Sequence, residues 1–308
     1  MTATAPEELF AALDVARAPA DGPAAFGADL APRTLLAAYR RGLFPLPAAD
    51  PYASAFNEAR CEGAVAAGEI ALLPVPGADP EADADPAADP YALAWWSPDP
   101  RPLLAVDGVR LGRKLSRLLR NRLDWWTTAD LAFGEVLAAC AEGREPPWLT
   151  EDLQRALTGL HRIGAAHSAE VWEEGELVGG VFGIVAGPVL SLDSMFHRRP
   201  DAARVAVADL AARFAAAGGT LLDAQRDSPH VRSLGAVPQP RARYLAALAG
   251  DAGDAGDAGD GEETGRAVGP LDTVRLPAAR LAPERPREPH RHGHPRAHRH
   301  PYRNARRA

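Results

Sequence analysis

Hydrophobic and polar residues follow two different periods along the chain, and the change of period predicts the elements. Apolar residues recur every three to four positions, which indicates amphipathic helices, in 32–42, 111–122, 131–141, 151–163 and 201–219. They alternate with polar residues in 167–196, which predicts two or three antiparallel strands, and a further short strand is expected at 220–224. Helices, hairpin strands, a long helix and a final strand predict an α+β fold with a helix packed on a sheet.

Polar residues that precede apolar runs predict where two of these helices begin. Thr128 or Asp130 is expected to cap the helix at 131–141, because a side-chain oxygen there can accept from a free amide of the first turn. Thr150, followed by two acids, is expected to cap the helix at 151–163 in the same way.

Two segments have compositions that disfavour packed structure. Residues 48–92 contain GADPEADADPAADP and are interpreted as a disordered loop insertion, and 250–308 begin with GDAGDAGDAGDG and are interpreted as a disordered tail. The remainder predicts a small N-terminal domain over 1–110 and a second domain over 111–249.

Charge and cysteine content narrow the class of protein. The formal net charge is -7, but acids cluster just after Gly250 and Arg residues follow them, so the folded part is only mildly acidic. Two cysteines without ligand spacing, no secretory signal and no apolar run of membrane-spanning length favour a cytoplasmic protein that needs no membrane, and we expect a monomer.

Aromatic and basic side chains suggest a binding surface. Adjacent Trp95 and Trp96 on a strand face opposite ways, so one of them can be core while the other covers a domain or contacts a ligand. Trp148 follows two prolines in a loop, where a large aromatic favours binding. The helix at 111–122 carries five cations away from its leucine stripe, which fits either a solvated face or contact with a nucleic-acid backbone.

Polar residues inside apolar strands are the candidates for chemistry. Asp193 interrupts LDSMF, and Asp223 with Gln225 ends TLLDAQ, so each is either a satisfied structural group or part of a site. Gly179 and Gly180 predict a bulge or a close backbone approach, to a ligand or within the packed core. No zinc spacing, Walker loop or dinucleotide fingerprint precedes the tail, so no metal and no cofactor is expected.

Several motifs in register resemble one family. ADLAPRTLLAAYRRGLFP, WWSPDPR, the Trp148 loop, LHRIGAAHSAEVW, LVGGVFG, DSMF, DAQ and HVRSLGA occur in the order typical of a leucyl/phenylalanyl-tRNA–protein transferase. The resemblance runs from about Gly27 to Leu248, apart from the insertion. It implies a small N-terminal domain and a C-terminal domain similar to the Gcn5-related acetyltransferase (acyl-CoA N-acyltransferase) fold.

The resemblance also implies an activity and its partners. Such an enzyme moves Leu or Phe from aminoacyl-tRNA to the N-terminal Arg or Lys of an acceptor protein, which marks that protein for degradation by the N-degron route. Because the ester is already activated, the enzyme has mainly to position the amine, remove a proton and stabilise the oxyanion.

The site residues are carried over onto matching positions. The resemblance implies that Gln225 contacts the attacking amine and that Asp223 orients its amide. It also implies a substrate site and a tRNA-binding face: the pocket is lined by Val181, Leu210 and Leu222 with Asp193 at its polar edge, Trp148 contacts the terminal adenosine, and the acceptor stem meets Arg113, Arg117 and Arg120.

The sequence departs from the family pattern at positions that bear on binding. Asp193 replaces a Glu, and Leu46 stands where an aromatic usually follows Phe-Pro, so one side of the adenosine stack is missing or is supplied by Trp95 or Trp96. Two alternatives stay open. One is an acyl-CoA-dependent N-acyltransferase using Arg232-Ser-Leu-Gly-Ala-Val, and the other is an RNA-binding protein without chemistry.

Overall fold

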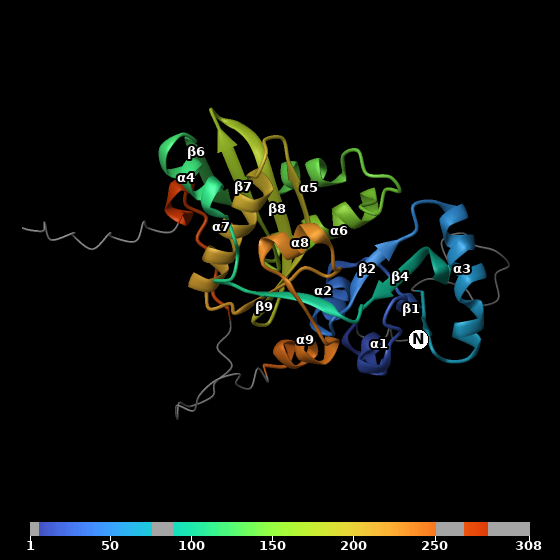
Figure 1. Ribbon diagram of the computed structural model, residues 1–308. Helices are drawn as coiled ribbons and strands as arrows, with labels where there is room; N and C mark the ends of the chain where they lie inside the picture. Colours follow the sequence, from blue (N-terminus) through green and yellow to red (C-terminus); the bar gives the residue numbers. More distant parts are fainter. Residues whose placement is uncertain (1–5, 76–88, 251–267, 283–308) are drawn as a thin grey trace, which may run out of the picture.

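The computed structural model describes residues 6–75, 89–250 and 268–282 and contains two β-sheets (Figure 1). The smaller sheet has the order β2-β4-β1-β3, with β1 parallel to β3 and antiparallel to β4. Its strands are β1 (Pro23–Gly27), β2 (Phe44–Pro47), β3 (Ala71–Leu73) and β4 (Leu93–Trp96). The helical elements of this part are α1 (Pro6–Ala11), η1 (Val15–Arg17), α2 (Pro32–Arg40), α3 (Pro51–Ala66) and η3 (Pro90–Ala92).

The larger sheet has eight strands in the order β11-β5-β10-β9-β8-β7-β6-β12. Its strands are β5 (Arg101–Ala105), β6 (Trp125–Ala129), β7 (Ala166–Glu173), β8 (Glu176–Ala186), β9 (Val189–His197), β10 (Leu221–Asp223), β11 (Val237–Gln239) and β12 (Leu276–Pro277). The accompanying helices are α4 (Arg113–Asn121), α5 (Phe133–Ala141), α6 (Glu151–Arg162), α7 (Ala202–Ala216), α8 (Pro229–Leu234), α9 (Arg241–Leu248) and η4 (Ala278–Leu281).

Helices cover both faces of the central strands. On one face α7 packs against β7, β8 and β9, in a core that includes Val181, Leu190 and Leu222. On the other face Phe182 and Ile184 pack with α2, α5 and α6. Alternate residues of a strand point to opposite faces, so each central strand contributes to both cores. The predicted α+β fold, with a long helix on a sheet of antiparallel strands, is confirmed.

The segment interpreted as a disordered insertion contains a helix, so that prediction was wrong for most of its described residues. Asp50 accepts from the amide of Ala53 at 2.8 Å and caps α3, whose Ser54 and Cys61 are buried. A capped N-terminus with proline in the first turn stabilises a helix whatever follows it along the chain. Residues 76–88, which carry the Pro- and Asp-rich repeat, lie outside the described residues.

The segment interpreted as a tail also contains packed structure. Residues 268–282 return to the larger sheet, where β12 pairs with β6 and Ala278 is fully buried. Arg280 forms an ion pair with buried Asp209 of α7 at 2.5 Å. The prediction of a disordered tail from 250 onward was therefore wrong for this stretch, and residues 251–267 and 283–308 lie outside the described residues.

The boundary between the two sheets falls earlier than the predicted domain limit at 110. β4 belongs to the smaller sheet and β5 to the larger, so residues 97–100 make the connection. Arg241 of α9 holds this connection, because its main-chain amide donates to Asp99 at 3.0 Å and its guanidinium donates to the carbonyl of Ser97. The predicted N-terminal domain thus contributes one strand to the second sheet.

The two predicted helix caps had different outcomes. Thr150 accepts from the amide of Leu153 at 3.3 Å, which confirms it as the cap of α6. The capping of α5 by Thr128 or Asp130 was wrong, because Ala132 occupies that position without a side-chain bond. Thr128 lies in β6 and donates to Glu170, and Asp130 accepts from the amide of Ser168.

Candidate active site

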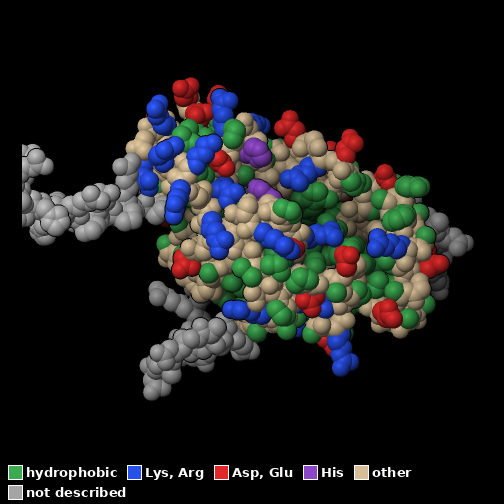
Figure 2. All heavy atoms as spheres, viewed as in Figure 1, with side chains coloured by type: hydrophobic (Ala, Val, Ile, Leu, Met, Phe, Trp, Pro, Cys, Tyr) green, Lys and Arg blue, Asp and Glu red, His purple; other side chains and the backbone are tan. Residues whose placement is uncertain are grey.

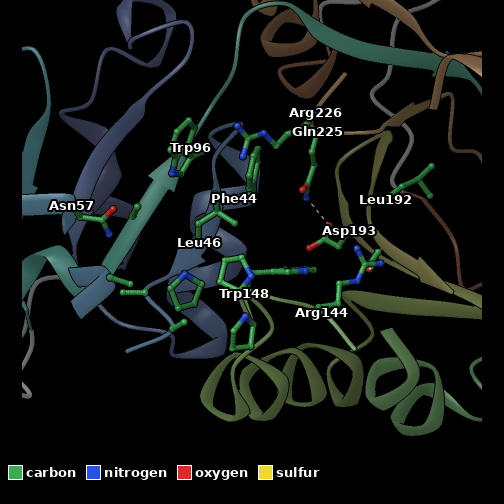
Figure 3. Close-up of a pocket in the computed structure, with 18 of the residues that line it drawn as sticks. Phe44, Leu46, Asn57, Trp96, Arg144, Trp148, Leu192, Asp193, Gln225 and Arg226 are labelled. Atoms are coloured by element: carbon green, nitrogen blue, oxygen red, sulfur yellow. Dashed lines mark hydrogen bonds between the residues drawn. The ribbon is translucent and has the colours of Figure 1, made fainter. Parts of the chain in front are cut away.

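A cavity of about 530 Å³ lies where the smaller sheet meets the middle of β9 and the end of β10 (Figure 3). Both sheets and the loop that follows α5 contribute to it. Its lining includes Phe44, Leu46, Asn57, Trp96, Arg144, Trp148, Leu192, Asp193, Ala224, Gln225 and Arg226. The walls are mainly apolar and aromatic, and the polar groups gather at one end around Asp193 and Gln225, an arrangement typical of a small-molecule site.

A buried ion pair anchors the polar end of the cavity. Arg101 donates from Nε and from an NH2 nitrogen to the two oxygens of Asp223 at 2.9 and 2.8 Å, and both side chains are fully buried. The guanidinium lies over the Tyr244 ring, 4.2 Å from its centroid. A two-pronged pair fixes the position and plane of a carboxylate more tightly than a single hydrogen bond does. Asp223 is therefore held as a rigid anion.

Gln225 follows this anion in an unusual backbone conformation. Its φ is +57°, in the left-handed region that non-glycine residues rarely occupy. Its main-chain amide donates to Asp223 Oδ1 at 2.9 Å, which compensates the conformational cost. Strained residues held by surrounding structure concentrate at functional sites. The turn directs the Gln225 side chain into the cavity, where Figure 3 shows it.

The Gln225 amide is oriented by residues of β9. Its Nε2 donates to Asp193 Oδ1 at 2.8 Å and to Ser191 Oγ at 3.0 Å. Asp223 was expected to orient this amide, but its carboxylate accepts from the main-chain nitrogen of Gln225 and from Arg101. The reason is geometric, because the tight turn after Asp223 brings the following backbone, and not the side chain, to its oxygens. In the structure Asp193 and Ser191, and not Asp223, accept from the Gln225 side-chain amide.

Asp193 reaches the cavity because it is the extra residue of a β-bulge. Phe182 pairs with Ser194 and Gly183 pairs with Leu192, so Asp193 has no partner across β8. A bulge re-aims the side chain of the unpaired residue and is common beside active sites. A Cβ on Gly183 would lie 2.1 Å from the carbonyl oxygen of Ser191, so this close approach of the strands requires glycine.

Burial raises the pKa of Asp193 to about 7, although the hydrogen bond donated by the Tyr39 hydroxyl opposes the shift. Burial and the neighbouring Asp193 raise the pKa of Tyr39 well above its ordinary value, so this phenol remains a donor. The carboxyl group therefore changes its charge near neutral pH. Such a perturbed group in a cavity is a candidate for acid–base chemistry.

Aromatic and cationic side chains form the remaining walls. Trp95 is fully buried and donates to the carbonyl of Gly27 at 2.9 Å, whereas Trp96 lines the cavity, as expected for neighbours on a strand. Trp148 lines the same cavity, and Figure 3 shows it with Leu46 between it and Trp96. The Arg226 guanidinium lies 5.0 Å from the centroid of the Trp96 ring.

Three residues predicted to line the pocket lie elsewhere. All three are fully buried in the core under α7, and none of them lines the cavity. They are Val181, Leu210 and Leu222. Leu222 alternates with Asp223 on β10, so it points to the opposite face of the sheet. Phe44, Leu46 and Leu192 provide apolar walls of this cavity, and a role of Val181, Leu210 and Leu222 in holding the transferred side chain stays a prediction.

The two strand glycines serve packing within the protein. A Cβ on Gly179 would lie 2.5 Å from the Cβ of Ala202, at the start of α7, and a Cβ on Gly180 would lie 2.8 Å from the Phe196 ring. The register between β7 and β8 also shifts beside Gly179. The expected bulge and close approach are both present, and the approach is to protein atoms.

The predicted tRNA-binding cations lie away from the cavity. Arg113, Lys114 and Arg117 are exposed on α4, and Arg120 is half-buried. Lys and Arg side chains gather over the part of the surface where Figure 1 places α4 (Figure 2). Leu115 and Leu119 are buried beneath this face, as the leucine stripe predicts.

Metal and membrane features can be stated for the described ranges only. Among residues 6–75, 89–250 and 268–282, no group of three or more His, Cys, Asp or Glu side chains is placed to hold a metal ion. The His-rich segment near the C-terminus lies outside these ranges. In the same part of the chain, no helix combines the length and the apolar character that crossing a bilayer requires.

Sequence reasoning missed three residues that organise the site. Arg101 was visible as a cation opening the apolar strand RPLLA, but its partner lies 122 positions away. Tyr39 and Ser191, which contact Asp193 and the Gln225 amide, fell within runs interpreted as helix and strand. A polar group inside an apolar element was the available signal, and it does not identify the partner.

One end of the aromatic cavity combines a buried ion pair, a glutamine in the left-handed backbone conformation and a carboxyl group whose pKa is raised to about 7. These features define an enzyme-type site on an α+β scaffold. Residues 103–249 match the family model described as "Leucyl/phenylalanyl-tRNA protein transferase". The chain belongs to the leucyl/phenylalanyl-tRNA–protein transferase family.

Curated relatives establish this membership. A leucyl/phenylalanyl-tRNA–protein transferase from Aromatoleum aromaticum is 38% identical, over 74% of this chain and 81% of the relative. Proteins of the same name from Syntrophotalea carbinolica and Xanthomonas oryzae pv. oryzae are 39% and 35% identical, each over 79% of this chain and over 88% and 82% of their own lengths. Similar solved structures include a GCN5-related N-acetyltransferase from Kribbella flavida, 15% identical, covering 46% of this chain and 55% of that chain, with a TM-score of 0.30.

Proposed function

We propose that the protein transfers Leu or Phe from aminoacyl-tRNA to the α-amino group of an acceptor protein that begins with Arg or Lys. The observation that carries this proposal is the cavity in which Gln225 and Asp193 share a hydrogen bond beside Trp96 and Trp148. An aminoacyl-adenosine end has an aromatic base, an ester and a small side chain. The cavity offers aromatic rings, polar acceptors and apolar walls to these three parts.

The chemistry follows from how the side chains are held. The Gln225 nitrogen is already bonded to Ser191 and Asp193, so its oxygen is the atom available to accept from an amine. Holding the amine against an activated ester accelerates the reaction through proximity and orientation. Asp223 contributes indirectly, because with Arg101 it fixes the turn from which Gln225 projects.

The substrate contacts divide between the cavity and α4. We place the terminal adenosine against the Trp148 ring, in the cavity that Trp96 also lines, since Leu46 cannot stack on a base. The acceptor stem would lie on Arg113, Arg117 and Arg120 of α4, where the exposed side chains of Arg113 and Arg117 suit phosphate contact. Trp95 is excluded from stacking because it is fully buried.

An acyl-CoA-dependent reaction is the competing proposal, and the geometry disfavours it. Such enzymes bind pyrophosphate on amides at the N-terminus of a helix. The run Arg232-Ser-Leu-Gly-Ala-Val lies at the C-terminal end of α8, where Gly235 ends the helix with a φ of 118°. A helix C-terminus presents carbonyl oxygens, which repel an anion.

The deciding experiment supplies both kinds of donor. Purified protein is incubated with [14C]leucyl-tRNA and a peptide that begins with Arg, with acetyl-CoA in a parallel reaction. Label is expected in the peptide from the tRNA donor alone. The same peptide with an acetylated N-terminus is the matched control and should remain unlabelled. RNA binding without transfer from either leucyl- or phenylalanyl-tRNA would support the non-catalytic RNA-binding alternative.

The wider role follows from the same proposal. Addition of Leu or Phe to the N-terminus would mark the acceptor for degradation by the N-degron route, and the reaction would take place in the cytoplasm, where charged tRNA is made. We also propose that the protein acts as a monomer. Sedimentation analysis at micromolar concentration would test this, and a dimer would contradict it.

A further inference from the structure

We propose that the Asp193 carboxylate takes the proton from the attacking amine and returns it to the departing 3′-oxygen, while Gln225 only positions the amine. This assignment rests on the proposed function. It concerns the step that the Gln225 amide cannot itself perform, because an amide oxygen accepts hydrogen bonds but is a very weak base. The arrangement of Asp193 in the cavity carries the argument.

Hydrogen bonds to β9 fix the orientation of the Gln225 side-chain amide. Both of its hydrogen bonds are made by Nε2, at 2.8 Å to Asp193 and 3.0 Å to Ser191. Its oxygen is thereby left to the substrate. An amine that donates to this oxygen would sit beside the carboxylate that holds the same amide from the other side.

The Asp193 carboxylate has capacity for that proton. Tyr39 donates to Oδ2 and Gln225 donates to Oδ1, and each carboxylate oxygen can accept a second bond. Asp193 lines the cavity and is half-buried, so it can meet the substrate. Asp223 lacks this freedom, because it is fully buried and accepts from Arg101 and from the Gln225 main chain.

Within the described ranges, no Lys or Arg side chain forms an ion pair with Asp193. Arg101 is bonded to Asp223, and Arg144 donates to Ser194 Oγ and to the Met195 carbonyl, each at 3.2 Å. The groups that face Asp193 or line its cavity are Tyr39 from α2, Arg101 from β5, Arg144 after α5, Asp223 and Arg226 at the end of β10, and Tyr244 from α9. A pKa of about 7 supports the assignment, since it approaches that of an α-amino group, about 7.7–8.0.

The step balances without any further reactant. The neutral amine nitrogen attacks the ester carbon, a C–N bond forms, and the carbonyl electrons move to oxygen. The proton of the resulting ammonium passes to the Asp193 carboxylate. When the tetrahedral species collapses, the bond from carbon to the 3′-oxygen breaks, and that oxygen receives the proton from Asp193. The enzyme returns to its starting charge, and the products are a peptide bond and deacylated tRNA.

The test measures single-turnover transfer from [14C]leucyl-tRNA to an Arg-initiated peptide as a function of pH. Two acceptor peptides with different α-amino pKa values separate the titration of the amine from that of the enzyme. We expect the plot of transfer rate against pH to have a rising limb, the enzyme limb, with an apparent pKa near 7 that is the same for both acceptors. D193N should lose this limb and lower the transfer rate by about 10²–10⁴-fold while leaving the Kd for leucyl-tRNA unchanged. D193E restores a carboxylate and should recover part of the rate.

Two further variants distinguish a catalytic role from a structural one. S191A removes the other acceptor of the Gln225 amide without removing an ionisable group, so its profile should keep the enzyme limb. Y39F removes a hydrogen bond that lowers the pKa of Asp193, so its limb should move to higher pH. A limb that stays in place in Y39F would contradict the assignment.

The result identifies which proposal fails. If the wild-type protein transfers neither Leu nor Phe, the proposed function is overturned and this assignment with it. If the wild-type protein transfers Leu and folded D193N retains half or more of the rate, the assignment to Asp193 is overturned and the proposed function stands. The assignment is also overturned if the pH profiles of wild type and D193N both follow only the titration of the acceptor amine.

Discussion

Arg101 and Asp223 form a two-pronged ion pair at 2.9 and 2.8 Å, and the two side chains lie 122 positions apart in the chain with no exposure to solvent. The pair joins β5 to β10, which are neighbours in the larger sheet. The polar end of the cavity is therefore positioned by an interaction that is closed to solvent.

Removing Arg101 should destabilise the fold as well as reduce transfer. R101M leaves Asp223 as a buried unpaired anion, and breaking a buried pair in this way costs about 3–5 kcal/mol in the free energy of unfolding. Urea unfolding followed by circular dichroism measures the loss. The control is R199A, which breaks an exposed pair with Glu173 and should change stability little. Equal midpoints for the two variants would contradict the interpretation of Arg101 as an anchor.

Asp193 should make the stability of the protein depend on pH. Its pKa is raised from 3.8 to about 7 in the folded state, so the folded protein binds more protons than the unfolded chain between these values. The contribution of Asp193 to stability therefore falls as pH rises from about 4 to 7 and is constant above. D193N should remove this fall, and near pH 8 it should be more stable than wild type by roughly 1–3 kcal/mol. Unfolding curves at pH 5 and pH 8 check the difference, and a gap that does not grow with pH would refute it.

The C-terminal segment should be required for stability, contrary to its interpretation as a tail. Arg213 donates to the carbonyl of Val274 at 2.9 Å, and Asp209 accepts from Arg280 and Arg213. A chain that ends after Gly250 leaves these buried charges short of partners, and each missing bond costs about 1–3 kcal/mol. Thermal melting should show a marked fall in Tm. A chain that ends after Ala282 keeps every one of these contacts and is the control, so equal Tm values would show that the segment contributes nothing.

The basic face of α4 should act through phosphate contacts if it binds tRNA. The double variant R113A/R117A should weaken leucyl-tRNA binding and reduce the slope of log Kd against log salt by about 2. Arg60 on α3 is also exposed and lies at the far end of the molecule, so R60A is a charge control. Filter binding at several salt concentrations measures both. An unchanged slope in the double variant would show that the face is merely solvated.

Leu46 offers a test by gain of binding. L46W adds a further large aromatic ring to the cavity that Trp148 and Trp96 line, and stacking on a base contributes about 1–3 kcal/mol. The KM for leucyl-tRNA should fall by about 5- to 150-fold, whereas L46A should leave it near the wild-type value. Steady-state transfer at saturating acceptor provides the measurement. A higher KM for L46W would indicate that the adenosine lies elsewhere.

Local patterns predicted the helices and central strands because period and caps are properties of neighbouring residues. The helix α3 was not predicted, because its segment was interpreted together with the Pro- and Asp-rich run that follows it. Asp50 and Pro51 are nevertheless typical of a helix start. The packing of 268–282 depends on Arg280 meeting Asp209 across 71 positions, which no local pattern contains.

The same distinction applies to the site. Asp223, Gln225 and Asp193 were found because each interrupts an apolar strand at a motif that resembles the family. Which of them contacts the Gln225 amide depends on the bulge at Asp193 and the turn at Gln225, and both follow from pairing between strands. Leu222 lies on the opposite side of β10 from Asp223, in the core under α7, and this placement is set by the sheet and not by its distance from Asp223 in sequence.

The four residues between β4 and β5 have a consequence for how substrates enter. Trp96, which lines the cavity, ends β4, and Arg101, which binds Asp223, begins β5. The short connection between them is held by hydrogen bonds from Arg241. If the two sheets swung apart, residues 97–100 and the bonds from Arg241 would resist the motion, whereas Arg101 and Asp223 would move together because both belong to the larger sheet. We therefore expect that the loops at the rim, such as the one that carries Trp148, move to admit a substrate into a cavity whose polar end is already formed.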